Sequence, residues 1–380
     1  MRTLALIAGV VLIVLVLVDG FESVVLPRRV TRPYRLARFF IRSGWCLWTG
    51  MVSVLPGEKR RENYLSFFGP LSLPLLLGFW AMILLTGFAL LYWAPGNAIK
   101  TPDGVVSIGT CLYLSGTTFF TLGIGDFVPL TPYAKTIIVL ESGMGFAFLA
   151  VAISFLPALG QSISRREVTI LLLDARAGSP PTAAEILRRH AQDPGREALT
   201  RLLHEWELWS AEVLESHLSF PVLVYFRSQH DNQSWLAALT SILDTCAFII
   251  ANGEGANVRQ ARLTFAMARH TIVDLALVLH APPREPGTDR LPLTALTFMR
   301  SRLVSEGMEL REDADSAGRL NELRRMYEPF VHSLSLRLHL VVPPWVLETG
   351  KRDNWQIDGP EKSSEFKRET QGRHGDESHF

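Results

Sequence analysis

Six consecutive residues, Thr121-Leu122-Gly123-Ile124-Gly125-Asp126, have the types and spacing to coordinate a cation. Glycines that alternate with larger residues permit left-handed backbone angles, which allows successive carbonyl oxygens to point toward one axis. Several such loops together can replace the water around a dehydrated cation. The hydroxyl of Thr121 supplies one more oxygen, and Asp126 places negative charge at the mouth. The segment therefore predicts a cation-coordinating loop.

Such a loop needs protein around it, because irregular backbone exposed to lipid would leave its amide groups unpaired. Residues 105–125 carry no charge, and a short apolar helix is predicted over residues 107–119. That helix is too short to cross a bilayer. We therefore expect the chain to enter the membrane partway, turn, and leave on the side from which it came. The partial negative charge at the end of the short helix favours a cation there.

Two long apolar stretches flank the loop. Residues 63–99 contain no charged side chain, and their core, Leu71–Trp93, measures ~34 Å as a helix. This length is enough to cross a hydrocarbon core of ~30 Å. Tyr92 lies at the end of this stretch, where aromatic rings favour the membrane interface. The second stretch, Thr136–Ser164, carries a single charge, that of Glu141, and is also long enough to span.

The order of these elements resembles the potassium channel pore family, in its bacterial type with two spans and one pore loop. The segment from Thr117 to Asp126 is similar to the family pattern T-x-x-T-V-G-Y-G-D. The resemblance covers residues 69–160, and it implies an outer helix, a pore helix, a filter and an inner helix. It also implies that the selectivity filter, which binds the permeant potassium ion, consists of Thr121, Leu122, Gly123, Ile124, Gly125 and Asp126.

Two filter positions depart from the family pattern. Leu122 stands where the family has Val, and Ile124 stands where it has Tyr, whose hydrogen bond behind the filter Ile cannot make. A non-selective monovalent cation channel therefore remains an alternative to a potassium channel. An alternative from another class is a membrane-anchored signalling or scaffold protein that does not conduct. With one loop per chain, four chains must meet to close a filter, so a conducting protein is expected to be a homotetramer.

Three residues of the predicted inner helix are further candidates. Gly145 and the nearby Gly143 lie where family members often carry a hinge, although small residues also let membrane helices pack closely. Glu141 is an ionisable group inside an apolar span and is therefore a functional candidate. It could hydrogen-bond polar residues of the pore helix, among them Ser115, or face the cavity and bind cations. The alternative is a protonated glutamate that packs against polar neighbours.

A third apolar stretch, Thr3–Val18, lies near the N-terminus. Nine Lys and Arg residues fall between Asp19 and Gly69, whereas two fall between the long apolar stretches. The positive-inside rule then places residues 19–69 and the C-terminal half in the cytoplasm. We expect residues 1–20 to be an uncleaved transmembrane helix with its N-terminus outside, in a multi-pass protein of the plasma membrane. A cleaved signal peptide is the alternative.

Residues 21–68 form a basic cytoplasmic or interfacial segment. Within residues 35–55, Arg35, Arg38 and Arg42 share one helical stripe and apolar side chains share another. A helix lying on the cytoplasmic membrane face fits this pattern; the alternative is an amphipathic helix packed on the cytosolic domain. Arginines at every third position of a spanning helix, which a voltage sensor needs, are absent from the sequence.

The remaining sequence predicts a mainly helical cytosolic domain over residues 161–350 and a disordered tail over residues 351–380. Short strands over 168–173, 222–226 and 334–340 are an open alternative. Gly253–Val258 lacks the third glycine of a nucleotide-binding loop and is interpreted as a turn between helices. His270 and Asp274 are interpreted as a surface or satisfied polar pair rather than a metal site.

Composition excludes several classes of protein. The 380 residues are 48% apolar and 20% charged, and their net charge of +1 gives no footprint for nucleic acid. Three distant cysteines exclude a disulfide framework, and the residues form no catalytic constellation. We expect a non-enzymatic protein with no cofactor and no metal beyond the permeant ion, whose partners are the lipid bilayer and copies of itself. The predicted fold is an all-α membrane protein: an N-terminal transmembrane helix, the pore module and the cytosolic helical domain. Its gating stimulus is left open.

Overall fold

The computed structural model describes residues 1–25, 35–100, 106–192, 195–228, 233–253, 256–311 and 315–347. This part of the chain is helical apart from turns and two short strands, which confirms the prediction of an all-α membrane protein. The strands β1 (Ile99–Lys100) and β2 (Val128–Pro129) pair antiparallel on either side of the pore helix in sequence. The predicted disordered tail, residues 351–380, lies outside the described residues.

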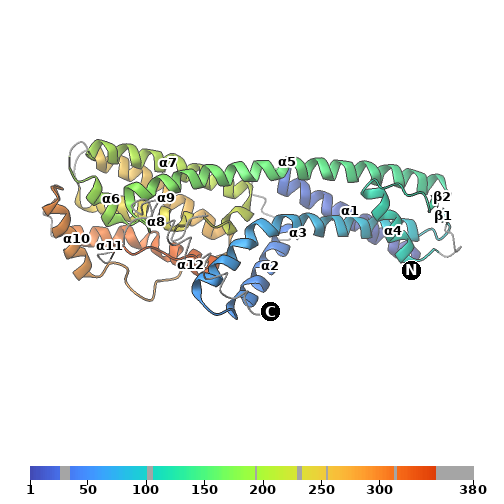
Figure 1. Cartoon of the computed structure of the whole chain (residues 1–380), viewed down its shortest axis with the longest axis horizontal. Coiled ribbons are helices and arrows are strands. Elements are labelled where there is room, and N and C mark those ends of the chain that lie inside the picture. Colours follow the sequence, from blue (N-terminus) through green and yellow to red (C-terminus); the bar gives the residue numbers. More distant parts are fainter. Residues whose placement is uncertain are drawn as a thin grey trace, which may run out of the picture. The chain divides into compact units, whose positions relative to one another are not determined.

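Contacts divide the chain into two compact units. The first unit consists of residues 1–163 and 217–226, and the second of residues 164–216 and 227–380. In the first unit the main elements are α1 (Arg2–Gly20), η1 (Phe21–Val25), α2 (Leu36–Ser53), α3 (Glu58–Trp93), α4 (Ile108–Phe119), the first part of α5 (Pro132–Ala177) and η2 (Pro221–Tyr225). Figure 1 shows their order along the chain.

The two long helices extend further than hydropathy predicts. The helix α3 begins at Glu58 rather than at Leu71, and α5 continues to Ala177 rather than ending at Ser164. Hydropathy detects only the stretch that is apolar enough for lipid. The backbone hydrogen bonds of each helix continue beyond that stretch, through charged residues. The predicted pore helix over residues 107–119 corresponds closely to α4.

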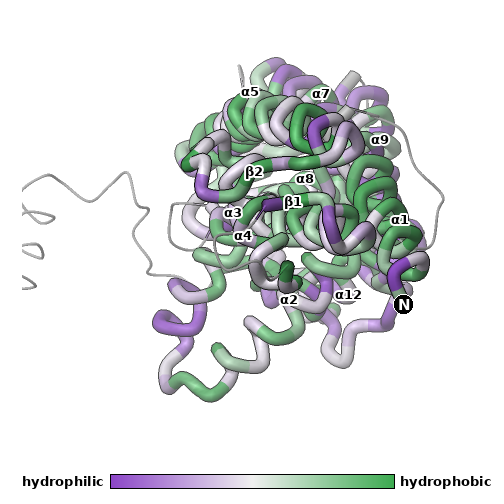
Figure 2. Tube along the Cα trace, turned by 90° about the vertical axis from the view of Figure 1, so that its right-hand side faces the viewer, coloured by the Kyte–Doolittle hydropathy of each residue, from purple (hydrophilic) through white to green (hydrophobic). Residues whose placement is uncertain are grey.

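The helix α1 lies along α3, and glycines allow the two backbones to approach closely (Figure 1). A Cβ atom built on Gly9 would lie 2.7 Å from the Gly87 carbonyl oxygen, and one on Gly87 would lie 2.8 Å from the Ile13 side chain. Small residues serve this purpose between membrane helices. The rest of α1 carries exposed apolar side chains, and Figure 2 shows its hydrophobic character.

The helix α2 packs on α3 through aromatic rings. The rings of Phe40 and Phe79 are 4.8 Å apart, and the ring of Trp45 lies 5.0 Å from that of Phe68 and 4.9 Å from that of Tyr225. Tyr225 ends η2, so residues 221–225 form a helical turn rather than the alternative strand. Exposed apolar side chains on α2 remain available for lipid, and an interfacial role for this helix stays a prediction.

The second unit is a helical bundle around α8 (Trp235–Asn252), whose side chains are almost all buried. The surrounding helices are α6 (Ala183–Arg189), α7 (Gly195–Ser219), α9 (Ala256–Val278), α10 (Leu293–Ser305), α11 (Ser316–Arg325) and α12 (Glu328–Leu338). Residues 168–173 lie in α5, and residues 334–338 lie in α12, so neither stretch is a strand.

Four helices of the described ranges are long and apolar enough to cross a membrane: α1, α3, α5 and α8. The last differs because its surface is covered within the second unit and because it contains Asp244. Asp244 is 1% exposed and bonds Arg290 (2.6 Å) and the Tyr327 hydroxyl (2.5 Å). The pairing of this buried carboxylate fits a core helix of a bundle.

Candidate functional site

The predicted filter segment has an alternating backbone. Thr121, Gly123 and Gly125 have φ values of 55°, 57° and 83°, whereas Leu122 and Ile124 are not in the left-handed region. Glycine adopts such angles without a steric cost, which is the reason for its alternation here. The left-handed angle at Thr121 has no glycine to indicate it and was not predicted. Such an alternation permits successive carbonyls to point toward one side, as cation coordination requires.

The pore helix α4 holds the start of this segment. Its N-terminus is capped by Ser107, whose hydroxyl accepts a hydrogen bond from the Thr110 backbone N–H (3.1 Å). At its other end, the Thr117 carbonyl accepts hydrogen bonds from the backbone N–H groups of Leu122 (2.8 Å) and Gly123 (3.4 Å). The position of the filter backbone therefore depends directly on the position of α4.

The side chains of the segment are exposed in the single chain. Leu122 is 64% exposed and Ile124 is 59% exposed, and Thr121 and Asp126 are also exposed. Asp126 hydrogen-bonds the hydroxyl of Tyr113, which lies on α4. Exposed apolar side chains of this kind mark a contact surface for further protein or for lipid.

The inner helix contacts the pore helix at Gly145. A Cβ atom at Gly145 would lie 1.9 Å from the Phe119 carbonyl oxygen, so a side chain cannot fit without a shift of one helix. Gly143, by contrast, faces open space. The geometry favours the close-packing alternative for Gly145, and a hinge at either glycine stays a prediction.

Glu141 lies between three helices of the first unit. Its side chain is fully buried, accepts a hydrogen bond from the Tyr92 hydroxyl of α3 (2.6 Å), and hydrogen-bonds the Ser115 hydroxyl of α4. The Ser115 hydroxyl also donates to the Leu85 carbonyl of α3 (3.0 Å). This arrangement matches the alternative in which Glu141 faces the pore helix, and the side chain does not face a cavity.

Sequence reasoning did not connect Tyr92 with Glu141. The Tyr92 side chain is 0% exposed, so its ring packs inside the first unit, and its depth in a membrane stays a prediction. The phenol instead supplies the buried hydrogen bond that Glu141 requires. A tyrosine and a glutamate buried in neighbouring spans are a pair that could have been considered together, because each needs a partner away from water.

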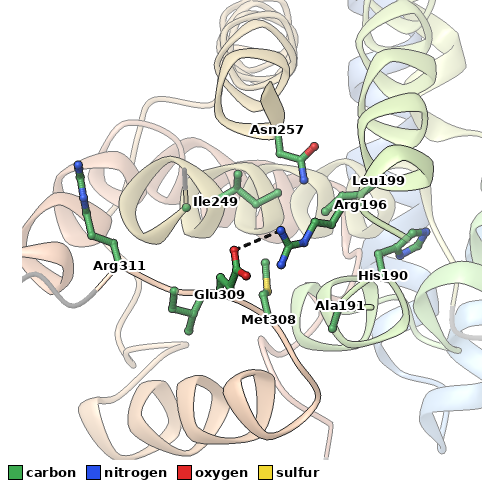
Figure 3. A pocket seen from close by; sticks show the side chains of 11 residues that line it. His190, Ala191, Arg196, Leu199, Ile249, Asn257, Met308, Glu309 and Arg311 are labelled. Atoms are coloured by element: carbon green, nitrogen blue, oxygen red, sulfur yellow. Dashed lines mark hydrogen bonds and ion pairs between the residues drawn. The ribbon is translucent and has the colours of Figure 1, made fainter. Parts of the chain in front are cut away.

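The second unit contains a cavity of about 270 Å³ between α6, α7, α8 and α9, shown in Figure 3. Its charged walls are paired: Arg196 lies 3.2 Å from Glu309. His190 contacts the Ile186 carbonyl through Nδ1 (2.7 Å), and burial lowers its pKa. Arg311 also lines the cavity, and Gly253 and Asn257 of its lining belong to the Gly253–Val258 segment, which is interpreted as a turn between helices.

Two other motifs lie as the sequence analysis interprets them, as a turn between helices and as a polar pair. Gly253 donates to the Ile249 carbonyl (2.8 Å) just after α8, and α9 begins at Ala256; residues 254 and 255 lie outside the described range. His270 lies 3.5 Å from Asp274 on the same helix. In the part of the chain that the structure describes, no group of three or more His, Cys, Asp or Glu residues could hold a metal ion.

Comparison with known proteins agrees with this geometry. Residues 78–160 match a family model described as an ion channel, which confirms the resemblance for this segment. The chain is also 24% identical over 255 residues to the uncharacterized membrane protein YdjJ of Bacillus subtilis (strain 168), covering 66% of this chain and 72% of the relative. No solved structure matches the chain. These findings indicate a membrane protein in which residues 78–160 resemble an ion channel.

Proposed function

We propose that the ion channel domain of residues 78–160 forms the pore of a homotetrameric channel that passes potassium ions down their gradient. The observation that carries the proposal is the alternation of left-handed angles at Thr121, Gly123 and Gly125. In a tetramer, four such segments would surround one axis with carbonyl oxygens, and Asp126 would supply negative charge at the mouth. Potassium is the substrate, and no cofactor is needed.

The proposed topology places the filter mouth outside the cell. Arg2 at the start of α1 lies beside Gly96, just after α3, so the N-terminus shares one side with the pore loop. The basic residues of the 21–68 segment favour the cytoplasmic side. We therefore propose an N-terminus outside the cell, a second unit in the cytoplasm and a location in the plasma membrane.

The departures at Leu122 and Ile124 favour a second candidate, a non-selective monovalent cation channel. The reversal potential with potassium on one side of a bilayer and sodium on the other distinguishes the two. A potential close to zero supports the non-selective pore, and a large potential of the sign set by the potassium gradient supports the potassium channel. A tetramer that carries no monovalent ion supports the non-conducting scaffold.

The first prediction concerns Gly123→Asp. Aspartate disfavours the positive φ of this position, and it adds a charge to the filter, so rubidium uptake into liposomes should fall to background. Gly143→Ala, at a glycine with open space around it, is the matched control. Both variants should assemble like the wild type in cross-linking. Undiminished uptake by Gly123→Asp would show that the filter lies elsewhere.

A further inference from the structure

We infer that Glu141 is a positioning residue for selectivity: it carries a proton and, through Ser115, fixes the pore helix that holds the filter. This inference rests on the proposed function. It assigns a role to a side chain that lies behind the pore helix and touches no filter residue among its recorded contacts. The grounds are the register of two helices, the accounting of hydrogen bonds and the dependence of the filter on α4.

The inner helix contacts the pore helix at two positions. Glu141 meets Ser115, and one turn further along both helices Gly145 meets Phe119. Residues four apart lie on one face of a helix, so the two contacts form a single line along α5 and α4. The contact between Gly145 and Phe119 sets the distance between the two backbones. The contact between Glu141 and Ser115 sets the rotation of α4 and its position along its own axis.

The number of available hydrogens around Ser115 indicates that the Glu141 carboxyl group is protonated. The Ser115 hydroxyl has one hydrogen but two neighbouring oxygens that can accept it, the Leu85 carbonyl and Glu141 Oε1. One hydrogen cannot serve both contacts, so both are hydrogen bonds at the same time only if Glu141 supplies the second hydrogen to the Ser115 oxygen. Tyr92 donates to the other carboxyl oxygen, Oε2. A protonated Glu141 therefore allows all three contacts to be hydrogen bonds, whereas a carboxylate would leave one of the two Ser115 contacts without a hydrogen and would be a buried charge without a cationic partner among these contacts.

The titratable groups near this pair face Tyr92: Cys111 on α4 and Tyr133 on α5, which reaches the Leu91 carbonyl (3.4 Å). Among the described residues, the hydrogen-bond partners of the Glu141 carboxyl are Tyr92 and Ser115, and neither carries a positive charge that would pair with a carboxylate.

The link to the filter runs through two residues of one helix. Ser115 lies two positions before Thr117, whose carbonyl holds the backbone N–H groups of Leu122 and Gly123. A pore helix released at Ser115 would shift this carbonyl and with it the oxygens that face the ion. Selectivity depends on the placement of those oxygens, so it should respond more strongly than assembly.

The test compares three variants of the full-length protein in liposomes. Glu141→Gln keeps a neutral side chain that donates to Ser115 and accepts from Tyr92, so its potassium-to-sodium permeability ratio should stay within about twofold of wild type. Glu141→Ala removes both hydrogen bonds, and its ratio should fall about tenfold, a change of the size that the loss of buried hydrogen bonds produces. Thr136→Val, at an exposed position of the same helix, is the matched control and should change nothing.

A merely structural role would lower the yield of tetramers and the flux together, leaving the permeability ratio of the surviving channels unchanged. If Glu141→Ala does not assemble, Ser115→Ala removes only a hydroxyl and should lower the ratio in the same way. The two substitutions combined should cost no more than either alone.

The outcomes separate the two proposals. An unchanged permeability ratio in Glu141→Ala or in Ser115→Ala would overturn the positioning role. A ratio in Glu141→Gln as low as that in Glu141→Ala would overturn the inference that Glu141 is protonated. Wild-type tetramers that carry no ion would overturn the proposed function and this inference with it.

Discussion

At the scale of single residues, Gly145 shows how a missing side chain can set a distance. The inner helix approaches the Phe119 carbonyl so closely that even a methyl group has no room, whereas Gly143 two residues earlier has open space. The two glycines therefore have different surroundings, although their spacing suggests a single hinge. Only the position of α4 distinguishes them.

We predict that Gly145→Ala lowers both rubidium flux and the midpoint of thermal unfolding. The added methyl group must displace α4 or α5, at a cost of roughly 1–3 kcal/mol. Gly143→Ala is the control, and it should be neutral or slightly stabilising because alanine favours a helix. A loss of flux in Gly143→Ala, with Gly145→Ala unaffected, would favour the hinge and contradict close packing.

At the scale of elements, Asp19 joins three helices of the first unit. Its carboxyl Oδ2 accepts hydrogen bonds from the backbone N–H of Ala37 (2.9 Å) and from the Trp80 indole N–H (2.9 Å), and the residue is 4% exposed. It thereby satisfies the start of α2 from the end of α1, as an N-cap would, and ties both to α3. Sequence reasoning treated it only as the end of the first span.

Asp19→Ala is predicted to destabilise this junction by about 2 kcal/mol, because two buried donors lose their acceptor. Asp19→Asn keeps a carbonyl oxygen and should cost less. Thermal unfolding in detergent measures both, with the exposed neighbour Leu17→Ala as the control. Equal midpoints for Asp19→Ala and Leu17→Ala would contradict the role of the carboxyl.

A pH effect belongs to α6, where Glu185 bonds Arg188 (2.7 Å) and Arg189 (2.6 Å). Hydrogen bonds from Arg188 and Arg189 lower the pKa of Glu185 from its usual 4.5 to about 2. Because the pKa is lowered on folding, the stabilisation is present above about pH 4.5 and is lost as the pH falls toward 2.

The wild type should therefore melt at a higher temperature than Glu185→Gln at pH 6, and the difference should shrink by pH 3. Glu197→Gln tests a weaker pair on α7, in which Arg201 lies 3.7 Å away and both side chains are largely exposed. It should show little difference at either pH. If the difference in melting temperature between the wild type and Glu185→Gln grows on acidification, the predicted direction of the pH effect is wrong.

At the scale of the whole molecule, one segment from the C-terminal half belongs to the first unit. Residues 217–226 cluster with α2, α3 and the inner helix: the ring of Phe220 lies 5.4 Å from that of Phe155, and Phe226 packs against Gly69. The chain thus returns to the first unit after α7, and residues beyond its main segment contribute to the core of that unit.

We predict that Phe226→Ala lowers the unfolding free energy by roughly 3 kcal/mol, the usual cost of removing a ring from a core. Limited proteolysis and thermal unfolding of the full chain measure the change. Leu208→Ala, on the exposed side of α7, is the control. If the two variants melt together, the segment does not stabilise the first unit.

The sequence alone determined the positive φ angles of Gly123 and Gly125, the short helix before them, the long apolar helices and the helical class of the C-terminal half. Each follows from local properties: the freedom of glycine at positive φ, the length of an uncharged stretch and the helical period of apolar residues. These properties act between near neighbours in the chain, so they can be read without knowing where distant residues lie.

Only the tertiary structure decided which distant groups meet: Glu141 with Tyr92 and Ser115, Gly145 with Phe119, and residues 217–226 with the first unit. The physical reason is rotation. Successive residues of a helix are turned by about 100°, so an error of one residue in the register directs a side chain to a different neighbour. Hydropathy does not fix that rotation, and the packing of the helices does.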